Sequence, residues 1–192
     1  MTLSFGNAVI ALSATILLTL SFALGPVSHL VPSFTRARAQ RKAFGLIGYA
    51  LAALHSLLAG LVVLRSAEPV AYSDAVSVVF ASLAFTIFTL MALTSTSAWI
   101  RALGYANWKA LQRTGYLALA FTLLHVVLLE QGVFLTRVVG QTAIGFMLLV
   151  LLVRAVILIG QARPLQLART WLEQDVDIEL RRTGPTARLS ED

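Results

Sequence analysis

The chain has 192 residues, of which 58% are hydrophobic and only 12% are charged. Soluble domains carry about twice that share of charged residues, so this chain has too little polar surface to coat a water-exposed core. It contains no cysteine, which excludes disulfides, iron–sulfur clusters and thiolate metal sites. The net charge of +6 comes from basic residues that flank apolar blocks. That pattern is typical of membrane topology and argues against nucleic acid as a partner.

Five apolar blocks, each near the length that crosses a bilayer, predict five transmembrane helices. In chain order they cover about residues 8–24, 44–64, 76–93, 111–129 and 134–159. The first block ends at Gly25 and Pro26 and has neither a basic leader nor a small-residue cleavage site. We therefore interpret it as a retained helix and not as a signal peptide. The predicted fold class is an all-α integral membrane protein, with a five-helix transmembrane bundle over residues 1–160.

The distribution of lysine and arginine predicts the orientation of this bundle. With five spans, 13 of the 15 basic residues fall on one face, and only Arg65 and Arg137 fall on the other. Because basic residues gather on the cytoplasmic side, we expect the N-terminus outside and the C-terminus in the cytoplasm. The polar residues 161–192 then form a cytoplasmic tail. Apolar positions in it fit a helix on the membrane surface or against a partner, and a frayed charged tail fits equally well.

Two histidines, His55 and His125, lie at matched depths in the second and fourth predicted spans. Each follows a polar residue near the cytoplasmic end of its span, Lys42 or Gln112, by 13 positions. Thirteen residues of helix measure roughly 20 Å, so both imidazoles are expected in the outer half of the bilayer. An ionisable side chain at that depth is costly and by default marks a functional site.

The segments around the two histidines also match each other at an offset of 70 residues, which pairs Gly45 with Gly115. Gly48 falls on the same helix face as His55. Missing side chains at these glycines leave room for a flat, bulky group. Two facing neutral imidazoles are suited to the axial positions of a haem, while two histidines alone make an incomplete zinc shell. A single membrane histidine more often forms an interhelical hydrogen bond, but the matched pair favours haem.

Around these residues the sequence resembles the ferric-reductase-like transmembrane family, over about residues 6–158. The matching positions are Arg41, Lys42, Phe44, Gly45, Leu46, Tyr49 and His55, then Thr94, Ser95, Arg101, Leu103, Gly104, Trp108, Leu111, Arg113, Tyr116 and His125. Within the family the chain is most similar to the haem-binding membrane subunits of bacterial methionine-sulfoxide reductase systems. The resemblance implies a multi-pass protein of the bacterial inner (cytoplasmic) membrane that binds haem b through His55 and His125.

One departure from the family pattern affects the expected number of haems. Members with two haems carry a histidine where this chain has Gln112, so the resemblance implies a single outer haem and a lost inner site. The sequence has no Rossmann-type glycine-rich loop for a nicotinamide or flavin dinucleotide. One haem passes one electron and cannot accept a hydride. The predicted function is therefore a cytochrome b-like subunit that relays electrons between other membrane or peripheral redox subunits.

Several alternatives remain open at this stage. A quinone or flavin at the cytoplasmic side, or a partner's cofactor, would have to bridge the path to an outer haem. His29, near that face, could contribute to such a site or be a plain interfacial residue. The main rival function is an accessory structural subunit with a structural haem or none. A small transporter is disfavoured, because no other mid-membrane charge and no paired helix break marks a pathway.

Overall fold

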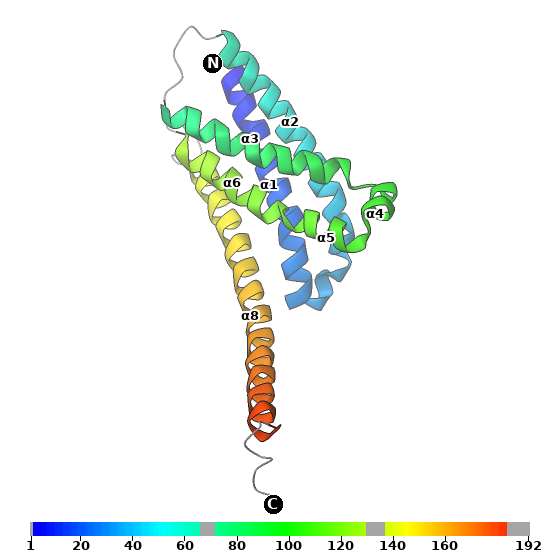
Figure 1. Ribbon diagram of the computed structural model, residues 1–192. Helices are drawn as coiled ribbons and strands as arrows, with labels where there is room; N and C mark the ends of the chain where they lie inside the picture. Colours follow the sequence, from blue (N-terminus) through cyan, green and yellow to red (C-terminus); the bar gives the residue numbers. More distant parts are fainter. Residues whose placement is uncertain (1, 66–71, 130–136, 184–192) are drawn as a thin grey trace, which may run out of the picture. The chain divides into compact units, whose positions relative to one another are not determined.

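The computed structural model describes residues 2–65, 72–129 and 137–183, and every regular element in these ranges is helical (Figure 1). The elements are α1 (Thr2–Leu30), η1 (Pro32–Thr35), η2 (Ala37–Gln40), α2 (Arg41–Arg65), α3 (Tyr72–Leu93), α4 (Ser97–Leu103), α5 (Tyr105–Arg113), α6 (Gly115–Leu128) and α8 (Val138–Thr183).

Five helical segments in the described part of the chain are long and apolar enough to cross a membrane. They are Phe5–Ser28, Arg41–Val63, Asp74–Leu93, Tyr105–Leu128 and Val138–Gly160. The predicted five-helix integral membrane bundle is thereby confirmed. Large apolar side chains remain exposed on these helices, for example Leu57 at 62% and Leu152 at 62%. A bilayer accounts for such exposure, since lipid and not water surrounds these faces.

The first helix does not end at Gly25 and Pro26, as the sequence suggested, but continues to Leu30. Proline has no N–H, so Pro26 leaves the carbonyl of Phe22, four residues earlier, without its helical donor. The hydroxyl of Tyr116, on α6, donates to that carbonyl at 3.2 Å. A hydrogen bond from another helix thus replaces the one that proline removes, and α1 passes through the proline.

The predicted fourth span is also not one uninterrupted helix. The chain turns at Gly104, which has φ +74°, and forms the short helix α5 before α6 begins at Gly115. Between them, the N–H and the hydroxyl of Thr114 both donate to the carbonyl of Leu111, at 3.1 and 2.7 Å. A threonine hydroxyl that bonds a nearby backbone carbonyl competes with continuous helix. Apolar content alone does not reveal such a break.

The chain divides into two compact units, residues 1–152 and 153–192, and α8 contributes to both. Helix α8 runs without interruption through residue 160, where the sequence placed the end of the membrane domain. Residues 161–183 of the predicted polar tail are helical, and residues 184–192 lie outside the described residues.

The first unit is built from two helix pairs, because α1 packs along α2 and α3 packs along α6 (Figure 1). Its core contains side chains from both pairs and from the beginning of α8. The buried members are Leu18, Phe22, Ala23, Ala84, Phe88, Ala118, Leu119, Met147 and Val150. Leu119 and Met147 are fully buried. Polar side chains inside the unit bond to helix carbonyls, as Thr19 does to Thr15 at 2.7 Å. This core holds α2 and α6, the helices that carry the two histidines.

Candidate functional site

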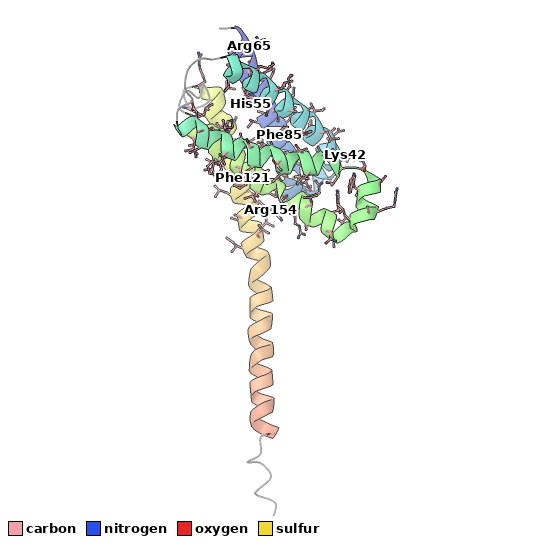
Figure 2. All side chains as sticks on the ribbon, turned by 45° about the horizontal axis from the view of Figure 1, so that its top comes forward. Lys42, His55, Arg65, Phe85, Phe121 and Arg154 are labelled. Atoms are coloured by element: carbon pink, nitrogen blue, oxygen red, sulfur yellow. The ribbon has the colours of Figure 1, made fainter. Side chains whose placement is uncertain are left out.

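His55 and His125 lie on helices that pack along different partners, α1 for His55 and α3 for His125, and not along one another. Both side chains are half-buried. Both histidines belong to the first compact unit. Figure 2 shows His55 on α2 between Lys42 and Arg65. The structure therefore brings the two predicted ligands to one region of the bundle.

The imidazole of His125 is held by Ser77, a fully buried residue near the start of α3. The Ser77 hydroxyl donates to the backbone carbonyl of His125 at 2.9 Å. That carbonyl lies in the last turn of α6, where helix carbonyls lack an intrahelical donor. The same hydroxyl oxygen lies 2.8 Å from Nδ1 of His125, and the Ser77 carbonyl lies 3.1 Å from it. Two oxygens of one residue thus face Nδ1.

The imidazole of His55 has a different partner, Asn7, in the second turn of α1. The side-chain oxygen Oδ1 of Asn7 lies 2.8 Å from Nδ1 of His55. This bond joins α1 to α2 within the membrane-spanning region, where a polar side chain needs an internal partner. Asn7 and Ser77 were not singled out from the sequence, because an isolated asparagine or serine in an apolar block carries no signal by itself.

In both rings Nδ1 is occupied, and Nε2 makes no hydrogen bond within the described residues. A histidine that binds a metal through one ring nitrogen almost always donates the other N–H to a carbonyl or similar oxygen. No group of three or more His, Cys, Asp and Glu side chains gathers in the described ranges. The pair therefore suits a cofactor whose metal already has its equatorial ligands, such as haem, better than a bare ion.

The three glycines predicted to make room for a cofactor all face protein neighbours. A Cβ on Gly48 would lie 3.0 Å from the backbone nitrogen of Leu18, so this glycine lets α1 approach α2 closely. A Cβ on Gly115 would overlap the ring of Phe22. A Cβ on Gly45 would lie 3.1 Å from Oγ of Ser21. Helix packing accounts for these contacts, and a contribution of the glycines to a haem site stays a prediction.

Gly45 and Gln112 line a separate cavity of about 550 Å³, at the end of the bundle predicted to face the cytoplasm. Its other lining residues are Leu18, Ser21, Phe22, Ala39, Arg41, Lys42, Leu46, Tyr49, Phe88, Met91, Ala92, Ser95, Ser97, Ile100, Tyr105, Trp108 and Lys109. Three of these side chains are cationic and none is acidic. The Gln112 amide donates to the carbonyl of Met91 at 3.4 Å. His29 lies at the end of α1, and its side chain is outside the described part of the structure.

The five spans and the intramembrane histidine pair define a multi-pass membrane protein whose polar site lies inside the helix bundle. The family described as ferric reductase like transmembrane component matches residues 8–123. This match covers more than half of the chain, which therefore belongs to that family and is a membrane redox subunit. His55 lies inside the matched range, and His125 lies two positions beyond it. No functionally curated protein matches the chain.

Proposed function

We propose that this chain is a cytochrome b-like membrane subunit that binds one haem b between α2 and α6 and relays electrons within a larger membrane assembly. The observation that carries the proposal is the pair of half-buried imidazoles on different helix hairpins. In each, Nδ1 is engaged, and Nε2 makes no hydrogen bond to the residues that the structure describes. His55 and His125 would hold the iron through Nε2. When bound, haem b supplies a carrier for a single electron.

The residues around His125 support an apolar cofactor environment. Phe121, one turn before His125, packs against Phe80, one turn after Ser77, with ring centroids 5.8 Å apart. This aromatic pair places apolar surface one turn away from Ser77 and from His125. A low local dielectric keeps the imidazoles neutral and so available as ligands. Gln112 lines the cavity of about 550 Å³ and carries an amide, which is a poor iron ligand compared with imidazole. The proposed stoichiometry is therefore one haem per chain.

The cavity near Gln112 is the proposed site of the quinone or flavin that would connect this haem to an electron donor. Small-molecule sites usually measure about 300–1,000 Å³, and this cavity of about 550 Å³ falls in that range. Its walls combine aromatic rings with cations, as where Lys109 lies 6.0 Å from the Tyr105 ring centroid. We also propose that the chain works in the bacterial inner membrane, in a role similar to that of the haem-binding subunits of methionine-sulfoxide reductase systems.

Absorption spectroscopy of the purified protein, oxidised and then reduced, tests the haem proposal together with a pyridine haemochrome assay. We expect a low-spin bis-histidine spectrum and one haem b per chain. A purified protein that stays free of haem after expression with excess haem precursor would refute the proposal. A value near two haems per chain would refute the stoichiometry.

A second candidate function is that of an accessory structural subunit. It is favoured by the same contacts, because the hydrogen bonds of Asn7 with His55 and of Ser77 with His125 tie α1 to α2 and α3 to α6 without any cofactor. Removal of haem from the assembled complex separates the two candidates. An unchanged electron-transfer rate would favour the structural role, and a lost rate with an intact assembly would favour the relay.

A further inference from the structure

The cavity of about 550 Å³ lies at the depth of the lipid headgroups. The spans Arg41–Val63 and Tyr105–Leu128 both begin with a residue that lines it. An apolar span starts where headgroups give way to hydrocarbon. Tyr105 and Trp108, whose ring centroids lie 5.9 Å apart, both line the cavity, and both residue types are enriched at this level of a bilayer. The cavity is therefore within reach of a headgroup.

Two lysines line this cavity, and no acidic residue does so within the described ranges. Lys42 is exposed at the start of α2, at the opposite end of this helix from Arg65 (Figure 2). Lys109 is half-buried on α5. Arg41, the third lining cation, already lies against protein, with Cζ 5.7 Å from the centroid of the Phe22 ring. The charge of the cavity favours a ligand with a net negative charge.

The apolar wall of the cavity continues onto the lipid-facing surface of α2. Leu46 lines the cavity and is also 37% exposed, on a helix that is long and apolar enough to cross the membrane. Other lining residues, such as Leu18 and Phe88, belong to the buried core. A ligand can therefore place an anionic group at the lysines and an apolar chain along Leu46. A lipid combines these two properties.

We propose that this cavity binds the phosphate group of an anionic phospholipid, with Lys42 and Lys109 as cationic contacts and Leu46 beside an acyl chain. Basic pockets between membrane helices on the cytoplasmic side are suited to anionic headgroups. A zwitterionic headgroup brings an ammonium for which the described lining offers no carboxylate, so a net anionic headgroup binds better. One consequence rests on the proposed function: a lipid in this cavity keeps out the quinone or flavin proposed to bind there.

Native mass spectrometry of the full chain, titrated in detergent with phosphatidylglycerol, measures the affinity for the first bound lipid. Each basic residue near an anionic headgroup contributes roughly a fivefold factor, so Lys42→Gln combined with Lys109→Gln should weaken binding about 30-fold. Arg101→Gln combined with Arg113→Gln is the matched control and should leave the affinity nearly unchanged. Both arginines are exposed, on α4 and α5, and neither is among the lining residues. An equal loss in the two double variants would reveal a general attraction to the positive face and would overturn the site.

Two further titrations test the class of ligand. Phosphatidylcholine with the same acyl chains should bind several-fold more weakly, and equal binding would overturn the preference for an anion. Glycerol phosphate, which carries the anion without the chains, should not displace phosphatidylglycerol. Displacement would assign the cavity to a soluble phosphate compound and overturn the lipid.

The haem content of the same samples separates this inference from the proposed function. Haem-loaded protein without a preference for phosphatidylglycerol would overturn this inference alone. The expected lipid preference in a protein that takes up no haem would overturn the proposed function and leave the lipid site standing.

Discussion

The hydrogen bond between Tyr116 and Phe22 predicts an energetic coupling between Tyr116 and Pro26. Tyr116→Phe removes the donor that serves the Phe22 carbonyl, and Phe22 is 2% exposed. Inside a bilayer no water replaces the donor. Orphaning a buried acceptor costs about 1–3 kcal/mol, and single polar contacts in membrane bundles average about 0.6 kcal/mol. We therefore expect Tyr116→Phe to destabilise the bundle by about 1 kcal/mol.

Pro26→Ala should abolish most of this effect, because alanine returns an N–H to the same carbonyl. A double-mutant cycle measures the coupling, with unfolding of the micellar protein followed by circular dichroism during titration with SDS. Tyr116→Phe should cost about 1 kcal/mol with proline at position 26 and close to nothing with alanine. An equal cost in both backgrounds would refute the account of how α1 passes through its proline. The stability of Pro26→Ala alone serves as the control for changes in backbone entropy.

The remaining predictions concern packing, ligands and topology. Gly115→Ala should destabilise the bundle by about 1–3 kcal/mol through overlap with the Phe22 ring, whereas Gly60→Ala, which meets no atom within 4 Å, should be neutral or stabilising in the same assay. His55→Ala and His125→Ala should each abolish the low-spin haem spectrum, and His29→Ala should leave it unchanged. A low-spin band that survives either ligand substitution would contradict the assignment. Protease protection in oriented vesicles should place the C-terminus on the cytoplasmic side, and an external C-terminus would contradict the positive-inside argument.

The number of spans could be predicted from the sequence, but their boundaries could not. Bilayer thickness fixes the length of an apolar block, so each span is visible in composition alone. The end of α1 depends on whether a distant group satisfies the carbonyl freed by Pro26, and that group is Tyr116 on another helix. The break at Thr114 depends on a local side-chain hydrogen bond. Neither hydrogen bond can be recognised from the hydrophobic pattern of the sequence.

The two histidines could be paired from the sequence because depth in a membrane helix follows from residue spacing, and their role as haem ligands stays a prediction. The role of the nearby glycines was less accessible, because spacing does not say which neighbour fills the space. The space beside Gly48 is filled by Leu18, and the space beside Gly115 is filled by Phe22, both from α1. The sequence around a glycine is the same whether the glycine faces a cofactor or a neighbouring helix. Only the packing of α1 distinguishes the two cases.

The internal repeat extends beyond the two helices that carry the histidines. The offset of 70 residues was visible between the second and fourth spans, and extending it to the first and third spans pairs Asn7 with Ser77. Two copies of a helix hairpin place two histidines symmetrically, which explains their equal depth. The copies then differ at the residue whose side chain contacts each ring. The two histidines therefore meet different side chains at equivalent positions of the two copies.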